Sequence, residues 1–245
     1  MPKDYFDINN TTPLSKVKAG GRIHLIGVCG VAMGQLAAAL AGQGYQVSGS
    51  DKEFYEPMGS FLERAHVQLL RGYNPSNVPP DADLVIIGNA ISYGHPEVDA
   101  VERLGLPYNC FPKVLYEVAI SGKKSIVVCG THGKSTTTAL CASIFESLGR
   151  NPSYFVGGVA GQLSTSLKIG EGSVSIVEGD EYDSAFFAKV PKFKFYNPDT
   201  CIINAVEFDH ADIYADLSAV NREFDSLVRS LSKDAIALCL SLIHI

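Results

Sequence analysis

The feature that most constrains the fold is an apolar run that leads into glycine, lysine and a hydroxyl residue. Residues 125–149 read SIVVCGTHGKSTTTALCASIFESLG. The pattern predicts a buried strand, a glycine-rich turn, and a helix that begins close to the lysine. Units of this kind occur in α/β domains, where the turn amides, the lysine and the helix N-terminus bind phosphate. The sequence therefore predicts an α/β fold with a phosphate-binding loop.

The spacing of this loop is shorter than usual. The common pattern G-x-x-x-x-G-K-[ST] would need a glycine where the chain has Val128, and the chain instead has G-x-x-G-K-S over residues 130–135. A glycine-rich turn with an exposed lysine is the simpler alternative. Because a phosphate loop normally works with Mg²⁺, the hydroxyl of Ser135 is a candidate metal ligand.

Acidic residues follow a later predicted strand. The segment SVSIVEGDEYD stops at Glu178, with Asp180, Glu181 and Asp183 behind it. Acids directly after a buried strand lie at the carboxyl edge of a parallel sheet, where ligands bind in open α/β folds. We expect Glu178 to bind Mg²⁺ and leave the roles of the other three acids open, a solvated acidic turn being the alternative.

A second apolar run, TCIINAVEFDHADIY, also ends in polar residues: Asn204, Glu207, Asp209 and His210. A histidine at this place is either structural or, next to a magnesium nucleotide, a ligand for a second metal ion.

Residues 22–121 alternate apolar strands and amphipathic helices. We expect strands at 22–28, 46–51, 83–90 and 106–111, and helices at 31–45, 57–66 and 96–105. This order predicts a parallel sheet with helices on its faces, in the manner of a Rossmann-like domain. A second α/β series opens at residue 125, so we predict domains of residues 1–121 and 122–245. We expect the second domain to be incomplete, because the chain ends in an apolar run.

The first domain has a glycine loop of its own. The segment HLIGVCGVAMGQLA brings Gly27, Gly30 and Gly34 to a strand-to-helix turn, and Asp51 ends the next strand. The layout resembles a dinucleotide fingerprint, but G-x-G-x-x-G would need glycines at Cys29 and Ala32, which disfavours nicotinamide binding. A nucleotide diphosphate remains compatible with the turn. Asn89–Ser92 follow the third predicted strand, and we expect them along the same edge.

The composition of the chain limits the classes of partner that it can bind. A net charge of -6 disfavours a nucleic-acid surface, and no apolar stretch reaches the roughly 18 residues of a membrane span. The six cysteines form no Cys-x-x-Cys pair, which indicates free thiols in a reducing compartment. We therefore expect a cytoplasmic protein with no nucleic acid or membrane as partner. The sequence does not indicate the oligomeric state.

Six segments together resemble the Mur ligases, which join amino acids or peptides to UDP-N-acetylmuramate in cell-wall synthesis. They cover most of residues 22–230 and read HLIGVCGVAMGQLA, VSGSD, NAIS…HPEV, CGTHGKSTTTAL, VEGDEYDSAFF and NAVEFDHADIY. The resemblance implies a UDP-sugar-binding domain followed by an ATP-binding central domain. It also implies a third, C-terminal domain that lies beyond this chain.

The resemblance also implies roles for single residues. ATP would phosphorylate the carboxylate of UDP-N-acetylmuramate, and an amine would attack the acyl phosphate. Lys134 and the loop amides would hold the phosphates, Ser135 and Glu178 the first Mg²⁺, and His210 the second metal. The residues expected at ATP are Gly130, Thr131, His132, Gly133, Lys134, Ser135 and Thr136, with His132 on either phosphate or substrate. The residues expected at the UDP part are Gly27, Gly30, Gly34, Asp51, Asn89, Ala90, Ile91 and Ser92.

Details of these segments favour one amino substrate. Cys29–Gly30, GNAIS, EGDEYD and EFDHADIY look most like family members that attach the murein tripeptide L-alanyl-γ-D-glutamyl-meso-diaminopimelate. Members that add L-alanine are the alternative, although their acidic segment is closer to E-A-D-E-S-D. A nucleotide-binding fragment without catalysis is a second alternative.

Overall fold

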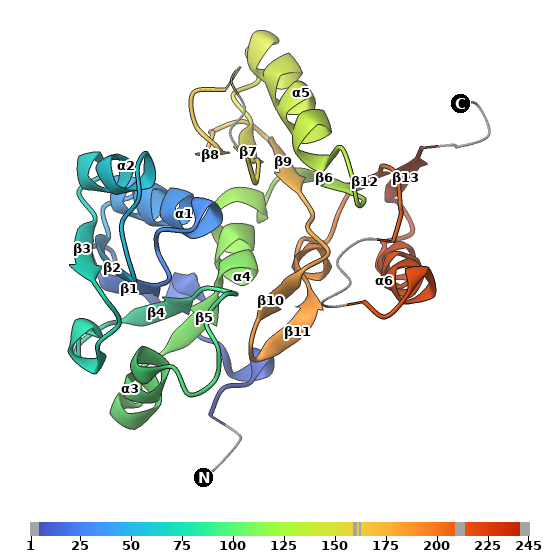
Figure 1. Ribbon diagram of the computed structural model, residues 1–245. Helices are drawn as coiled ribbons and strands as arrows, with labels where there is room; N and C mark the ends of the chain where they lie inside the picture. The colour runs from blue at the N-terminus through green and yellow to red at the C-terminus, as the bar shows by residue number, and fades with distance from the viewer. Residues whose placement is uncertain (1–4, 159–160, 162, 209–213, 241–245) are drawn as a thin grey trace. The chain divides into compact units, whose positions relative to one another are not determined.

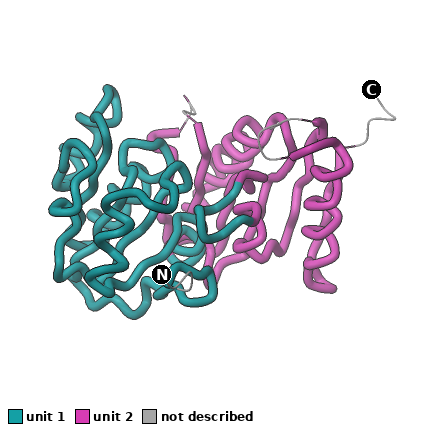
Figure 2. Tube along the Cα trace, turned by 60° about the horizontal axis from the view of Figure 1, so that its bottom comes forward, with its two compact units in different colours: residues 1–117, 183–189 teal, residues 118–182, 190–245 magenta. Residues whose placement is uncertain are grey.

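The structure is a computed structural model that describes residues 5–158, 161, 163–208 and 214–240. It divides into two compact units, residues 1–117 with 183–189 and residues 118–182 with 190–245 (Figure 2). Each unit contains a largely parallel sheet with helices, which confirms the predicted α/β class (Figure 1). The functional division into residues 1–121 and 122–245 stays a prediction.

The first unit is built on a five-stranded parallel sheet with strand order β3-β2-β1-β4-β5. This is the order of the first five strands of the doubly wound nucleotide-binding fold. The strands are β1 (Arg22–Ile26), β2 (Gln46–Asp51), β3 (Gln68–Arg71), β4 (Leu84–Ile87) and β5 (Tyr108–Cys110). The helices are η1 (Ile8–Asn10), η2 (Leu14–Lys16), α1 (Val31–Gly42), α2 (Met58–Arg64), η3 (Pro75–Asn77), α3 (Pro96–Leu104) and α4 (Phe111–Leu115).

Burial explains why these segments form a parallel sheet. All four residues of β4 are fully buried, as expected for a strand covered by helices on both faces. The close approach of α1 to its neighbours depends on Gly34, since a Cβ there would collide with Met58 and lie 3.1 Å from the Val28 carbonyl oxygen. Small residues on this helix thus let it pack directly against the loop that follows β1.

Residues 183–189 belong to the first unit although the chain around them belongs to the second. Phe186 and Phe187 lie in an aromatic cluster with Phe6 and Tyr108, and the rings of Phe187 and Tyr108 are 5.3 Å apart in an edge-on contact. Aromatic pairs in edge-on or stacked contact stabilise by about 0.5–1.5 kcal/mol beyond the area they bury, and three of these rings are partly buried. The cluster accounts for the position of this segment in the first unit.

The second unit has a six-stranded sheet with order β13-β12-β6-β9-β7-β8, in which only β7 and β8 pair antiparallel. The strands of this sheet are β6 (Lys124–Cys129), β7 (Ser153–Phe155), β8 (Leu167–Lys168), β9 (Val174–Glu178), β12 (Thr200–Ile203) and β13 (Ile236–Cys239). A separate two-stranded ribbon, of which residues 183–189 belong to the first unit, consists of β10 (Asp183–Ala185) and β11 (Ala188–Pro191). The helices are η4 (Tyr116–Ile120), α5 (Lys134–Ser147), η5 (Lys192–Phe195) and α6 (Leu217–Ser230).

Strand β6 is the centre of the second sheet. It pairs with β9 on one side and β12 on the other, while α5 connects it to β7 farther out. The chain thus leaves β6 towards one side of the sheet and later returns to the other. Crevices at such switch points, beside the carboxyl ends of the strands, are the places where open α/β sheets bind ligands.

Candidate functional site

The loop after β6 has a backbone that requires glycine at two positions. Gly130 has a φ of +124°, and a Cβ there would lie 3.0 Å from the Asn204 Cβ. Gly133 has a φ of +78° and is the N-cap of α5, which begins at Lys134. A side chain at either position would be strained, because L-residues avoid this part of φ/ψ space. The two glycines allow the chain to turn sharply from strand to helix.

The segment that follows β12 holds this loop in place. The Thr131 N–H donates to the Ala205 carbonyl at 2.8 Å, and its hydroxyl donates to the Glu207 carbonyl at 3.1 Å. The Glu207 N–H in turn donates to that hydroxyl at 3.0 Å. These bonds stabilise the loop within the protein itself. The first N–H groups of α5 lack partners within the helix, so the loop leads to an N-terminus suited to an anion.

Lys134 lies in the first turn of α5 and is largely buried. Its ammonium group contacts the Gly130 carbonyl at 2.7 Å and the Thr131 carbonyl at 3.2 Å. The same nitrogen lies 2.8 and 3.1 Å from the two carboxylate oxygens of Glu181. The positively charged ammonium group of Lys134 therefore lies within the loop and forms an ion pair with Glu181, which belongs to the segment after β9.

Glu178, the expected magnesium ligand, ends β9 and is 8% exposed. It is opposite Val128 in the sheet register, two residues before Gly130. One carboxylate oxygen accepts a hydrogen bond from the Gly157 N–H at 2.9 Å. A side chain at Gly157 would collide with this carboxylate, so glycine leaves room for it. The Glu178 carboxylate and the Ser135 hydroxyl are hard oxygen donors of the kind that Mg²⁺ prefers, so the residues fit this ion.

The three acids that follow Glu178 do not form a shared cluster. Asp180 pairs with Lys192 at 2.5 Å, Asp183 with Lys189 at 2.8 Å, and Glu181 with Lys134. Within the described ranges, no group of three histidine, cysteine or acidic side chains could hold a metal ion. In this protein these acids serve as counter-ions of lysines.

The two histidines of the predicted site differ in what the structure shows. His132 is exposed at the loop, with its Nε2 3.6 Å from a Glu207 carboxylate oxygen. Its side chain and that of Glu207 are 59% and 64% exposed, so the pair contributes little to stability. His210 and its neighbour Asp209 lie outside the described residues. The role of His210 as a metal ligand stays a prediction, as does that of Thr136, which is exposed in the first turn of α5.

The glycine loop of the first unit is also tied to the next strand. Gly27 has a φ of +81°, and the N–H groups of Gly27 and Val28 donate to the Ser50 carbonyl at 2.9 and 3.1 Å. The Cys29 N–H donates to a carboxylate oxygen of Asp51 at 2.8 Å. Gly30 is the N-cap of α1. Asp51 therefore fixes the loop from the end of β2.

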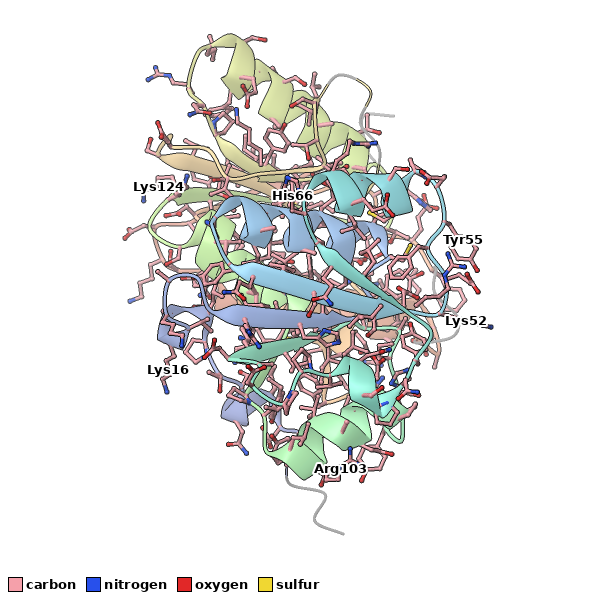
Figure 3. The ribbon with its side chains drawn as sticks, turned by 90° about the vertical axis from the view of Figure 1, so that its left-hand side faces the viewer. Lys16, Lys52, Tyr55, His66, Arg103 and Lys124 are labelled. Carbon is pink, nitrogen blue, oxygen red and sulfur yellow. The ribbon has the colours of Figure 1, made fainter. Side chains whose placement is uncertain are left out.

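Asp51 has a second partner in Tyr73, whose hydroxyl donates to its other carboxylate oxygen at 3.0 Å. Burial, reinforced by the charge of Asp51, raises the pKa of Tyr73, so this hydroxyl keeps its proton and remains a donor. Lys52 and Tyr55, which follow β2, lie at one end of the strands in Figure 3, whereas Lys16 lies at the other. The bond from Asp51 to a ribose hydroxyl stays a prediction.

The segment Asn89–Ser92 divides into exposed and buried residues. Asn89, Ala90 and Ser92 are exposed after β4, as residues at a ligand edge can be. Ile91 is 5% exposed and packs in the core of the first unit. Its side chain also lies against the glycine loop, because a Cβ added at Gly27 would be 3.4 Å from it. A contact of Ile91 with ligand would therefore involve its backbone, because its side chain supports the glycine loop.

The sequence analysis did not identify a buried polar network in the first unit. Glu97, in the first turn of α3, is fully buried and accepts from the Asn77 side chain at 2.8 Å and the Asn74 N–H at 3.0 Å. The Ser50 hydroxyl also donates to Glu97, and His24 lies behind it with its Nδ1 2.9 Å from the Ser48 hydroxyl. The only sequence signal for this network was the position of Glu97 in the first turn of a predicted helix. Acids at this position are also common on exposed helices, so the signal does not identify a buried network.

Comparisons with known proteins fit both units. Residues 22–122 match the model described as the Mur ligase family, catalytic domain, and residues 128–242 match the Mur ligase middle domain. A crystal structure of UDP-N-acetylmuramate:L-alanyl-gamma-D-glutamyl-meso-diaminopimelate ligase from Neisseria meningitides superposes with a TM-score of 0.85 at 36% identity, covering 91% of this chain and 72% of that one. The chain belongs to the Mur ligase family.

Curated Mur ligases of two substrate classes are similar to this chain. The UDP-N-acetylmuramate–L-alanyl-gamma-D-glutamyl-meso-2,6-diaminoheptandioate ligase of Escherichia coli K12 is 44% identical over 208 residues, which are 85% of this chain and 46% of that protein. A UDP-N-acetylmuramate–L-alanine ligase of Syntrophomonas wolfei is 31% identical over 219 residues, covering 89% of this chain and 45% of that protein. The chain thus spans about half the length of the curated relatives that it matches.

The six cysteines are all free thiols, as the sequence predicts. Among the residues that the structure describes, no helix has the length and hydropathy to cross a membrane.

Proposed function

We propose that the protein acts as an ATP-dependent ligase that joins L-alanyl-γ-D-glutamyl-meso-diaminopimelate to UDP-N-acetylmuramate, in peptidoglycan recycling. The observation that carries the proposal is the loop after β6, with two glycines at positive φ and a buried lysine at the start of α5. The greater identity to the E. coli tripeptide ligase, 44% against 31% for the L-alanine ligase, favours the tripeptide as amino substrate.

In this proposal the second unit binds ATP. The α5 N-terminus and Lys134 hold the β- and γ-phosphates, with Gly130–Thr136 around them. Ser135 and Glu178 hold Mg²⁺, and His210 serves a second metal ion. Bound magnesium would neutralise charge on the γ-phosphate while a carboxylate is phosphorylated. The residues of the chain orient the phosphates, and the bonds from Thr131 to the segment after β12 hold the loop in its shape.

The first unit binds UDP-N-acetylmuramate in the same proposal. Gly27, Gly30 and Gly34 allow the nucleotide to approach α1, with Asp51 and Asn89–Ser92 at the same edge of the sheet. ATP and nucleotide sugars are cytoplasmic metabolites, so we propose the cytoplasm as the location. An L-alanine-adding ligase is the second candidate, supported by the 31% identity to such an enzyme.

Phosphate release tests the proposal. We expect a version with the full length of the relatives to release phosphate from ATP only with UDP-N-acetylmuramate and the tripeptide together. Release with L-alanine in place of the tripeptide would establish the second candidate. Calorimetry on the 245-residue chain adds a separate measurement. If the chain binds Mg-ATP without turnover, it is a nucleotide-binding part of a ligase, whereas failure to bind Mg-ATP would refute the assignment of the loop.

A further inference from the structure

Lys134 forms an ion pair with Glu181, whose carboxylate is almost completely buried. The Glu181 side chain is 1% exposed and that of Lys134 is 12% exposed. Both carboxylate oxygens contact the ammonium nitrogen. A buried ion loses its hydration, and removing its partner typically costs about 3–5 kcal/mol. Glu181 is therefore costly to leave without its cation at any stage of a reaction cycle.

The backbone around Glu181 is anchored from two sides. The Tyr214 hydroxyl donates to the Glu181 carbonyl at 2.7 Å. The preceding residue, Asp180, accepts from the Lys192 N–H through its carbonyl at 3.0 Å and pairs with the Lys192 ammonium through its side chain. The carboxylate is thus fixed in place, and the flexible lysine side chain is the partner that adjusts.

The lysine ammonium has three N–H donors and four acceptors within 3.2 Å. Two of these acceptors are neutral carbonyls of the loop, and two are the oxygens of a charged carboxylate. The carboxylate carries a full negative charge, so its attraction for the ammonium is stronger than that of a carbonyl dipole, above all where both groups are buried. An arriving phosphate would therefore displace the loop carbonyls more readily than it would displace Glu181.

We propose that Glu181 is a positioning residue that keeps the Lys134 ammonium aimed at the phosphates, staying paired with it while phosphate oxygens replace the carbonyls of Gly130 and Thr131. The inference rests on the proposed function, because it needs a phosphate at the loop. A lysine–glutamate pair serves a related purpose in protein kinases, where it must be in place for phosphoryl transfer. Here the pair joins the first turn of α5 to the segment after β9.

Exchange of the lysine ammonium protons with water tests the inference in the 245-residue chain. With ¹⁵N-labelled lysine, the Lys134 signal is the one that Lys134→Arg removes. We expect Glu181→Gln to speed this exchange about tenfold or more, because the ammonium loses its charged partner. The matched control is Asp183→Asn, which removes a neighbouring charge that pairs with the exposed Lys189, and it should leave the Lys134 exchange rate within about twofold.

Mg-ATP separates a positioning role from a merely structural one. We expect exchange at Lys134 to remain about tenfold faster in Glu181→Gln than in the unchanged chain when both are saturated with nucleotide. Equal rates in the two nucleotide complexes, or no effect of Glu181→Gln without nucleotide, would overturn the inference. If calorimetry shows no binding of Mg-ATP to the unchanged chain, the proposed function fails. The comparison without nucleotide still decides whether Glu181 holds Lys134.

Discussion

His24 makes the stability of the first unit depend on pH. The ring lies fully buried on β1, with its Nδ1 2.9 Å from the Ser48 hydroxyl and its Nε2 3.4 Å from that of Ser50. Burial lowers the pKa of His24 to about 4 in the folded protein. In the unfolded chain the pKa returns to about 6.5. Between these values the unfolded state binds the additional proton, so stability decreases as pH falls.

The size of the effect follows from the two pKa values. At pH 7.5 the ring is neutral in both states and contributes no pH dependence. The linkage relation gives a loss of about 2 kcal/mol at pH 5 and about 3 kcal/mol at pH 4, relative to pH 7.5. A loss of this size is a large part of the stability of an ordinary domain. We therefore expect a clear shift of the urea midpoint within a pH range where most carboxylates remain ionised.

Urea titrations followed by circular dichroism at pH 7.5 and pH 5 measure this loss. His24→Gln removes the titrating group, and it should lower stability at pH 7.5 while reducing the pH dependence by about 2 kcal/mol. His66→Asn is the control, because His66 is exposed at a φ of +59°, a conformation that asparagine tolerates. If His24→Gln retains the full pH dependence of the unchanged protein, the assignment to His24 is wrong.

Three further predictions concern the candidate ligand sites of the two units. Lys134→Ala should weaken Mg-ATP binding by about 10- to 100-fold in calorimetry, because a charged hydrogen bond contributes about 1.5–3 kcal/mol; an unchanged affinity would contradict the loop assignment. Gly157→Ala would place a Cβ 3.1 Å from the Glu178 carboxyl carbon, so we expect magnesium-dependent nucleotide binding to fall while Gly158→Ala, with open space, leaves it unchanged. Tyr73→Phe removes the bond to Asp51 and should lower stability by about 1 kcal/mol and weaken binding of UDP, as thermal unfolding and calorimetry would show.

The sequence predicted the strands that contain a continuous apolar run most clearly. β4 is apolar at all four positions, and β6 is apolar from Ile126 to Cys129, so both patterns match strands covered on both faces. It did not predict β3, because Gln68 and Arg71 flank only two apolar residues at this edge of the sheet. The short strands β8, β10 and β11 were also missed, since each is two to four residues long and contains a charged residue, so none of them forms an apolar run.

The candidate site was predicted as a set of residue types at strand ends, but not as a set of contacts. Glu178, Asp180, Glu181 and Asp183 have the same character in the sequence, and all follow one strand. The structure separates them through partners that are distant in sequence, such as Lys134 for Glu181 and Gly157 for Glu178. Such partners depend on the order of strands in the sheet, which the local pattern does not encode.

The two glycine loops differ in the charge that the protein itself places beside the helix N-terminus. In the first unit the Asp51 carboxylate already accepts the Cys29 N–H, so a negative group occupies the approach to α1. In the second unit the Thr131 N–H is satisfied by a neutral carbonyl, and the Lys134 ammonium lies within the loop. An anion near α1 is opposed by the charge of Asp51, whereas near α5 the charge of Glu181 is balanced by the Lys134 ammonium, which an anion can approach. The second loop is therefore the one suited to the highly charged triphosphate, and the first suits a ligand with fewer charges and with hydroxyl groups that a carboxylate can accept.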